Sequence, residues 1–237
     1  MYGYGYSDGL YFALLAAMLL SFYASWKVKH TYKKYGDMRS ARGITGAQAA
    51  RIILSRNGLS GIPINQIQGT LSDNYDPRNN TLNLSSDVIN GTSPVAIGIA
   101  CHEVGHAIQN AENYLPAKIR SSVVPVAQIG TNIAFPLIIA GLLLSRLSAG
   151  LYQLVYLGII CFGLSTLFHL VTLPLEFNAS SRAIKNIEEA NILEGEEIGP
   201  AKKVLTAAAL TYVAALAVSV LQLLRFIAIY GGGNRRR

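Results

Sequence analysis

Apolar residues along the chain gather in four long stretches, and the segments between these stretches are polar. The stretches cover about residues 10–26, 127–144, 151–173 and 204–230. A helix that crosses the hydrocarbon core of a bilayer needs ~20 apolar residues, with a range of about 17–25. The pattern therefore predicts a mostly α-helical integral membrane protein with about four transmembrane helices.

The same pattern divides the chain into six segments. We expect a transmembrane anchor, a polar segment with a fold of its own, a transmembrane helical hairpin, a second polar segment, a last transmembrane helix and a disordered basic tail. Their expected bounds are residues 1–26, 27–122, 123–173, 174–203, 204–230 and 231–237.

Basic residues beside the first apolar stretch set the expected topology. Lys27, Lys29, Lys33 and Lys34 follow the stretch, whereas Asp8 is the charged residue before it. Because lysine and arginine collect in cytoplasmic loops, we expect a retained anchor in the cell membrane with its N-terminus outside. Both large polar segments then face the cytoplasm. The arginine-rich tail falls outside, against the same rule.

The first polar segment, residues 27–122, has the signals of a small α+β unit. Thr45 precedes apolar residues at helical spacing, and a helix is predicted from there to Leu54. Residues 62–67 and 81–84 have the pattern of short strands, and residues 71–76 that of a turn. Ser93-Pro94 then predicts the start of a helix over residues 95–111.

Composition agrees with membrane contact and disfavours nucleic-acid binding. Hydrophobic residues make up 51% of the chain and charged residues 14%, against about 25% charged in a soluble domain. The formal net charge is +7, but the basic residues lie beside apolar stretches rather than among aromatic residues. The partner we expect is a lipid membrane, not nucleic acid. Cys101 and Cys161 do not make a disulfide framework.

The residues His102-Glu103-Val104-Gly105-His106 fit the pattern H-E-x-x-H within the predicted helix over residues 95–111. Positions i and i+4 share a helix face, so both imidazoles can reach one Zn²⁺ ion. The glutamate between them can then act as general base toward a metal-bound water. The alternative is a solvated pair of surface histidines, which the apolar residues 95–100 disfavour because they bury this helix.

Glu176 is the favoured third ligand, since a catalytic zinc site usually has three protein ligands. It lies where the third apolar stretch ends, and two spans separate it from His102. Both residues are therefore expected on the same side of the membrane. The small residue Ala179, one turn later, would let the two helices approach closely. The alternative for Glu176 is an interfacial glutamate paired with Arg182 or Lys185.

Three other residues are weaker candidates for the third ligand. Glu112 stands six residues after His106, where metzincins place their third histidine, but on an unbroken helix it points away from the other ligands. His30 lies among lysines just after the first span, as an interfacial histidine would. His169 lies inside the third span.

Several segments resemble the YugP family of neutral zinc metallopeptidases. They are residues 72–78, 100–109, 173–183 and 201–214, and the resemblance covers nearly the whole chain. It implies a membrane-bound zinc metallopeptidase and leaves the substrate open.

A second resemblance concerns the third ligand alone. The residues Glu176-Phe-Asn-Ala179 are similar to the E-x-x-A-D segment of HtpX-type membrane gluzincins, which implies that Glu176 is the third ligand. Ser180 stands where those enzymes carry the aspartate. The role of that aspartate beside the ligands must therefore be absent or filled by another group, such as Asn178 or Arg182.

Taken together, these features predict a zinc metalloendopeptidase that acts on membrane proteins or unfolded polypeptides. We expect residues 81–84 to bind extended substrate by edge pairing. Tyr75 and Tyr114 are candidates for an oxyanion donor, although each fits a structural role better. The rival hypothesis is a non-catalytic membrane scaffold with a structural zinc site, which would need a fourth protein ligand. The sequence gives no oligomeric state.

Overall fold

The computed structural model describes residues 3–231, so the predicted basic tail lies outside the described residues except for Gly231. The chain forms two compact units. Within the described residues, the helical unit comprises residues 3–23, 118–173 and 212–231. The sheet unit comprises Ala24–Ala117 and Pro174–Thr211.

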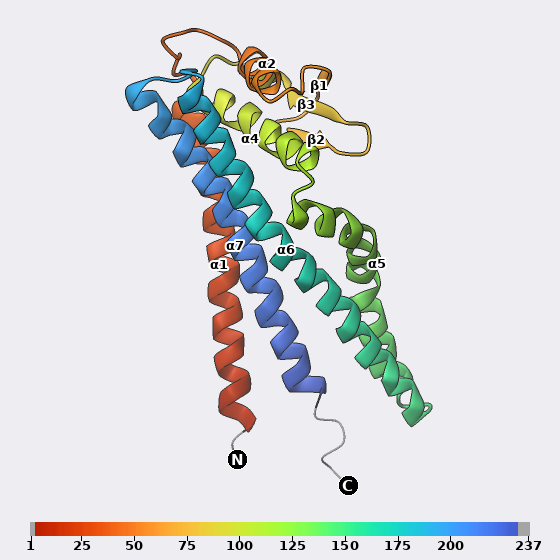
Figure 1. Cartoon of the computed structure of the whole chain (residues 1–237). Helices are drawn as coiled ribbons and strands as arrows, with labels where there is room; N and C mark the ends of the chain where they lie inside the picture. Colours follow the sequence, from red (N-terminus) through yellow and green to blue (C-terminus); the bar gives the residue numbers. More distant parts are fainter. Residues whose placement is uncertain (1–2, 232–237) are drawn as a thin grey trace. The chain divides into compact units, whose positions relative to one another are not determined.

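Four long helices dominate the described chain, and all four are long and apolar enough to cross a membrane (Figure 1). This confirms the predicted mostly α architecture with about four candidate spans. Each helix is longer than the apolar stretch that predicted it, because the helix continues into the polar residues that flank the stretch. The four are α1 (Gly3–Gly36), α5 (Leu115–Leu144), α6 (Gln153–Glu189) and α7 (Ile198–Tyr230).

Small residues bring the helices of the helical unit close together. A Cβ atom added to Gly158 of α6 would lie 2.7 Å from the carbonyl oxygen of Ala134 in α5, and one added to Gly130 would lie 2.9 Å from that of Cys161. Backbone contact of this kind is typical of helix pairs in membranes. A buried 2.7 Å hydrogen bond between the hydroxyls of Thr166 and Ser219 links α6 to α7.

The sheet unit adds three shorter helices and a three-stranded mixed sheet. The strand order is β1-β3-β2, with β3 parallel to β1 and antiparallel to β2. Helices α2 and α4 pack on each other, and α4 also contacts β2 and β3 (Figure 1). The elements are α2 (Gly46–Arg56), β1 (Ile64–Ile67), β2 (Asn74–Asp76), β3 (Thr81–Ser85), α3 (Ser86–Ile89) and α4 (Pro94–Ala111).

Side-chain caps fix the starts of α2 and α4 where the sequence predicts them. The Thr45 side chain accepts a hydrogen bond from the Gln48 N–H, and the Gln48 side chain accepts one from the Thr45 N–H, which makes a capping box. Ser93 caps α4 by accepting from the Ala96 N–H, with Pro94 in the first turn. The turn predicted over residues 71–76 is wrong in part, because Asn74–Asp76 forms β2.

The core of the sheet unit lies between the sheet and its helices. Leu82 and Leu84 of β3, Ile53 of α2 and Ile97 of α4 are almost fully buried within it. Burial of each such side chain stabilises the fold by about 1.5–3 kcal/mol. These contacts pack α4, which carries the H-E-x-x-H residues, against the sheet.

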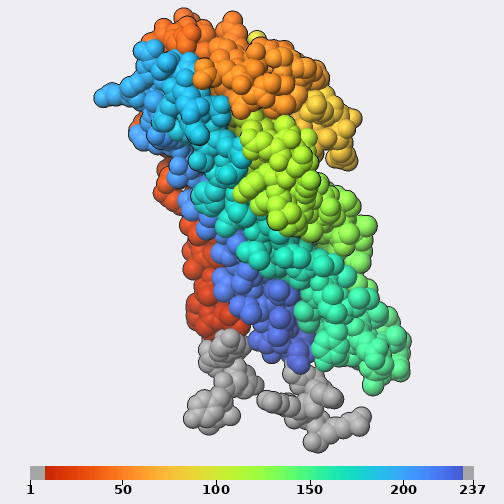
Figure 2. All heavy atoms as spheres, viewed as in Figure 1, coloured from red at the N-terminus to blue at the C-terminus, as the bar shows by residue number. Residues whose placement is uncertain are grey.

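Helix α6 approaches α4 closely at the level of that motif. A Cβ atom added to Gly105 would lie 2.6 Å from the carbonyl oxygen of Ala179, so no side chain separates the two backbones there. This confirms the close approach expected from the small Ala179. Figure 2 shows the two helices side by side on one surface of the sheet unit, α4 in lime and α6 in teal. The approach brings residues 174–183 against the motif.

Candidate metal centre

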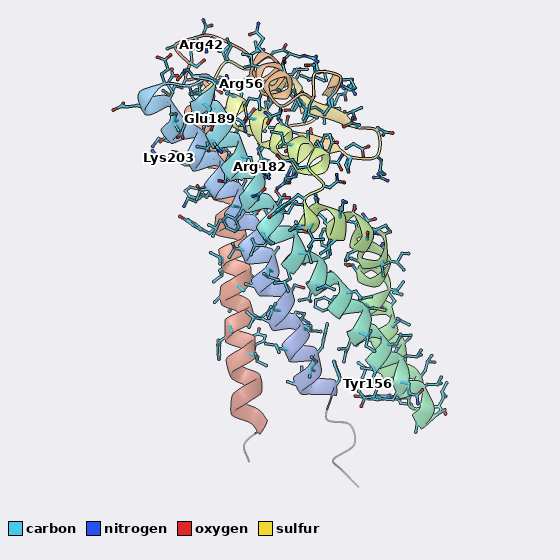
Figure 3. The ribbon with its side chains drawn as sticks, in the orientation of Figure 1. Arg42, Arg56, Tyr156, Arg182, Glu189 and Lys203 are labelled. Carbon is cyan, nitrogen blue, oxygen red and sulfur yellow. The ribbon has the colours of Figure 1, made fainter. Side chains whose placement is uncertain are left out.

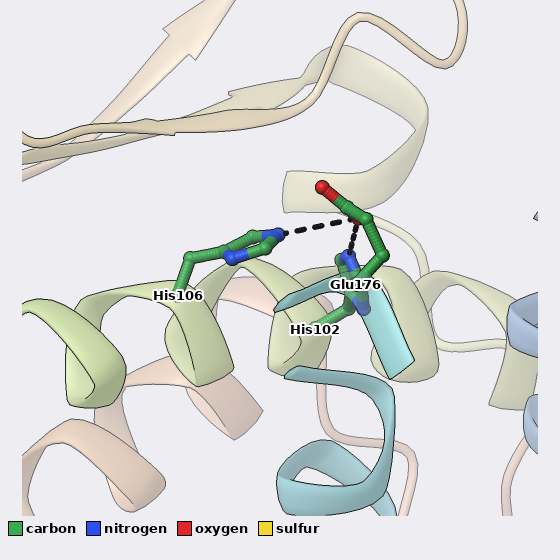
Figure 4. A group of neighbouring side chains, drawn as sticks. All are labelled: His102, His106 and Glu176. Atoms are coloured by element: carbon green, nitrogen blue, oxygen red, sulfur yellow. Dashed lines mark hydrogen bonds and ion pairs between the residues drawn. The ribbon is translucent and has the colours of Figure 1, made fainter. Parts of the chain in front are cut away.

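His102, His106 and Glu176 meet at this contact between α4 and α6 (Figure 4). The Glu176 Oε2 atom lies 3.3 Å from His102 Nε2 and 3.5 Å from His106 Nε2. One nitrogen or oxygen atom from each residue lies within 4.8 Å of the others. Two imidazoles and a carboxylate are the donor set of a catalytic zinc site, so the residues present fit the ion that the motif predicts.

Burial makes this cluster unlike a solvated surface pair of histidines. The side chains of His102 and His106 are 13% and 14% exposed, and that of Glu176 is 3% exposed. Burying a carboxylate is costly unless it is paired. A buried carboxylate facing two imidazole nitrogens is therefore an arrangement that a cation between them would stabilise.

The Nδ1 atom of each histidine has its own hydrogen-bond partner. The Ser180 hydroxyl lies 3.1 Å from His102 Nδ1. The Oε1 atom of Gln109 lies 2.9 Å from His106 Nδ1. Such partners orient metal-binding histidines. Ser180 itself thus stands beside His102, whereas Asn178 and Arg182, the groups suggested for the role of the missing aspartate, have other partners.

Asn178 and Arg182 instead belong to the surroundings of His106. The Gln109 amide nitrogen donates to the backbone oxygen of Leu175 and to Asn178 Oδ1, at 2.9 Å each. Arg182 Nε donates to the same Asn178 oxygen at 2.7 Å. These bonds tie the turn of α6 that carries Glu176 to α4.

Glu103 lies on the side of α4 that faces the sheet and is 9% exposed. Its Oε2 atom accepts a 2.9 Å hydrogen bond from the backbone N–H of Tyr75 in β2. Burial raises the pKa of Glu103, although His102, His106 and the Tyr75 N–H oppose the shift. A raised pKa lies closer to neutral pH, which suits a carboxylate that acts as a general base.

The pKa of His106 is also shifted. Burial disfavours its charged form, but the hydrogen bond with Glu176 and the charges of Glu103 and Glu176 outweigh burial and raise the pKa of His106.

The other candidates for the third ligand have different partners. Glu112 forms a 2.7 Å ion pair with Arg182, and Lys185 pairs with Glu189 at 3.7 Å. Arg182 and Lys185, the two basic residues that could have formed an ion pair with Glu176, therefore pair with other glutamates. His30 stacks on the ring of Trp26. His169 makes an edge contact with the neighbouring Phe168.

The strand expected to pair with substrate is the wrong one. Strand β3, at residues 81–85, is the central strand, so β1 and β2 occupy both of its edges. The edge strand that contacts α4 is β2. Tyr75 points its N–H away from β3 toward Glu103, and Leu82 opposite it turns its own N–H to Pro63. The prediction failed because residues 74–76 are too short to show strand periodicity.

Both candidate oxyanion tyrosines have structural partners. The Tyr75 hydroxyl donates to Asn80 Oδ1 at 2.7 Å and accepts from Asn110 Nδ2 at 2.9 Å. The Tyr114 ring lies 5.9 Å from the Arg182 guanidinium. These contacts fit the structural role that the sequence favoured for each.

Two groups of the site escaped the sequence reasoning: the side chain of Gln109 and the backbone N–H of Tyr75. Gln109 follows His102 by seven positions and His106 by three, a spacing that places it on the same helix face. That spacing could have revealed it. Nothing in the local sequence could have revealed the Tyr75 N–H, because its role depends on the packing of β2 against α4.

Comparisons with known proteins agree with this chemistry. A family model described as "Putative neutral zinc metallopeptidase" matches residues 10–231. A relative from Bacillus subtilis (strain 168), named "Putative membrane protease YugP", is 44% identical over 223 residues, which cover 94% of this chain and 97% of that protein. No solved structure matches the chain.

Proposed function

Since the chain belongs to this neutral zinc metallopeptidase family, we propose that it is a membrane-embedded zinc endopeptidase. His102, His106 and Glu176 hold the metal, and Glu103 is the general base. The observation that carries the proposal is the buried cluster of two imidazoles and a carboxylate, with Glu103 on the helix that carries both imidazoles. Among the described residues the cluster has three ligand side chains, one fewer than a closed structural site needs.

Each side chain has one task in this mechanism. Zinc, when bound, acts as a Lewis acid that polarises the scissile carbonyl and lowers the pKa of a water ligand to about 7. Glu103 takes the proton of the attacking water and passes it to the leaving amine. The Tyr75 N–H holds one oxygen of Glu103 and leaves the other free to receive that proton.

The substrate is an extended polypeptide segment that lies along the outer edge of β2. An edge strand binds a peptide through backbone groups that are not paired within its sheet. On the edge of β2 next to α4 the Tyr75 N–H is bound to Glu103, so the Tyr75 C=O, which also points away from β3, is the group that accepts from the peptide. Four helices that can span a membrane favour substrates in or near the bilayer, such as membrane proteins or unfolded chains. The lysines that end α1 favour a site on the cytoplasmic side.

Removal of zinc is the direct test of this proposal. Full-length protein in detergent is expected to hold one zinc ion and to cleave an unfolded protein such as casein. Dialysis against a chelator should abolish cleavage, and added zinc should restore it, because the metal is the Lewis acid of the reaction. Metal content and cleavage rate are measured on the same samples. Cleavage that survives complete loss of zinc would contradict the mechanism.

A Tyr75→Pro substitution tests how Glu103 is oriented. Proline removes the N–H that binds Glu103, and it should leave the sheet paired because that N–H faces away from β3. We expect kcat to fall at least about tenfold, the worth of a hydrogen bond of ~1.5 kcal/mol to a charged group. Zinc content should not change.

The matched control is Tyr75→Ala, which also loses the ring and hydroxyl but keeps the N–H. A kcat as low in Tyr75→Ala as in Tyr75→Pro would assign the effect to the side chain instead.

A further inference from the structure

We infer that Gln109 is the positioning residue that fixes the His106 ring for the metal, and that it must be an amide to do so. The inference rests on the proposed metal site and concerns a residue outside the H-E-x-x-H motif. Gln109 lies three residues after His106 on α4 and is 1% exposed. A glutamine buried this deeply is unusual unless all its polar atoms have partners.

The side chain of Gln109 does have a partner for each group. Its Oε1 atom lies 2.9 Å from His106 Nδ1. Its Nε2 atom donates to the backbone oxygen of Leu175 and to Asn178 Oδ1, both at 2.9 Å. One amide therefore connects the second metal ligand with the residue just before the third, Glu176.

The chemistry of these partners fixes which way the amide faces. The Leu175 oxygen is a carbonyl and can only accept. The Asn178 atom that meets Gln109 also meets Arg182 Nε at 2.7 Å, and a guanidinium can only donate. Asn178 must therefore present its oxygen to both neighbours. Two independent constraints thus require Gln109 to turn its NH₂ group toward α6 and its oxygen toward His106.

This orientation determines which nitrogen of the neutral His106 ring carries the hydrogen. Because the Gln109 oxygen can only accept, His106 Nδ1 must carry a hydrogen and donate it. In the neutral ring Nε2 then keeps its lone pair, and Nε2 is the atom 3.5 Å from Glu176 Oε2. The hydrogen bond from His106 Nδ1 to Gln109 therefore selects the tautomer that can bind a metal through Nε2.

The far end of this network lies outside the metal cluster. Arg182 projects from α6 near the end of α4 (Figure 3), where it forms a 2.7 Å ion pair with Glu112. The Glu112 side chain is 55% exposed. Arg182 thus fixes the orientation of Asn178 from the surface.

His102 has a partner of a different kind. The Ser180 hydroxyl beside its Nδ1 can donate or accept, so this contact does not fix a tautomer. The requirement for a fixed amide is therefore specific to His106.

Two changes from amide to carboxylate distinguish this inference from a general effect of packing or charge. Gln109→Glu keeps an acceptor for His106 but turns a second oxygen toward Leu175 and Asn178, where a donor is needed. Asn178→Asp keeps an acceptor toward both Gln109 and Arg182. Each change preserves the shape of the side chain and adds one negative charge near the cluster.

The zinc dissociation constant of each variant, from competition with a chelator, is the measurement. We expect Gln109→Glu to weaken zinc binding about 10–100-fold, the cost of losing a ligand's orienting partner, because repulsion between its second oxygen and the oxygens of Leu175 and Asn178 moves the carboxylate away from His106. Asn178→Asp should stay within a few-fold of wild type, and its Co²⁺ absorption spectrum should match that of wild type. The Co²⁺ spectrum of Gln109→Glu should differ, because the His106 ring is no longer held.

Gln109→Glu binding zinc as tightly as wild type, or both variants weakening alike, would overturn the inference. If Gln109→Glu fails to fold by circular dichroism, Gln109→Met replaces it, and the same weakening is expected because the Met thioether has no donor and is only a weak acceptor. Wild-type protein that binds no zinc would instead overturn the proposed function, and this inference with it.

Discussion

Glu103→Gln is expected to abolish peptidase activity while leaving zinc binding intact. An amide cannot take the proton of the attacking water, and a general base contributes about 10²–10⁴ in rate. We expect kcat/KM for casein to fall about a thousandfold, or about 4 kcal/mol in activation free energy. The substitution keeps the shape of a buried side chain, and an amide oxygen can still accept from the Tyr75 N–H.

The control for this variant is its zinc content, measured beside wild type. Glu103 is not among the three clustered ligand residues, so one zinc ion per chain should remain. Unchanged cleavage by Glu103→Gln with zinc bound would remove Glu103 from the mechanism. If wild type bound zinc and neither protein cleaved any substrate, the scaffold hypothesis would replace the peptidase.

The helix that carries the motif could be predicted from the sequence because its signals are local. Ser93 and Pro94 mark its start, and an i, i+4 spacing places His102 and His106 on one face whatever the rest of the fold does. Hydrophobic stretches of spanning length likewise identified the four long helices. Information of this kind lies within one or a few turns of the chain.

The arrangement around the motif could not be predicted so fully, because it depends on contacts between distant segments. Strand β2 has three residues, too few for an alternating pattern, and its edge position follows from pairing with β3. The direction of the Gln109 amide follows from Leu175 and Asn178, more than sixty positions away. A sequence shows that an amide is present but not which of its ends faces the metal.

The identity of the third ligand could be predicted in part from the sequence. Spacing and topology favoured Glu176 but left Glu112 and a simple interfacial ion pair open. The close approach of Gly105 to Ala179 brings the turn containing Glu176 against the motif, and Arg182 pairs with Glu112 instead. The distinction therefore arises from how tightly two backbones pack.

Glu176→Ala is accordingly expected to cost the site its metal. The change removes one of three ligands, so zinc affinity should fall more than about 100-fold, beyond the 10–100-fold cost of losing a group that merely orients a ligand. Casein cleavage should be lost as well. Chelator competition measures the affinity, and circular dichroism of the metal-free protein checks that the helices persist. Glu189→Ala, an exposed glutamate on the same helix, is the matched control and should bind zinc as wild type does.

The comparison with Glu112→Ala decides between the two candidate ligands. The Glu112 side chain is linked to the cluster indirectly, through Arg182, Asn178 and Gln109, so its loss should weaken zinc binding by a few-fold at most. Zinc retained by Glu176→Ala but lost by Glu112→Ala would reverse the assignment. That result would require α4 to end before Ala111, because on the intact helix Glu112 points away from the face that carries both histidines.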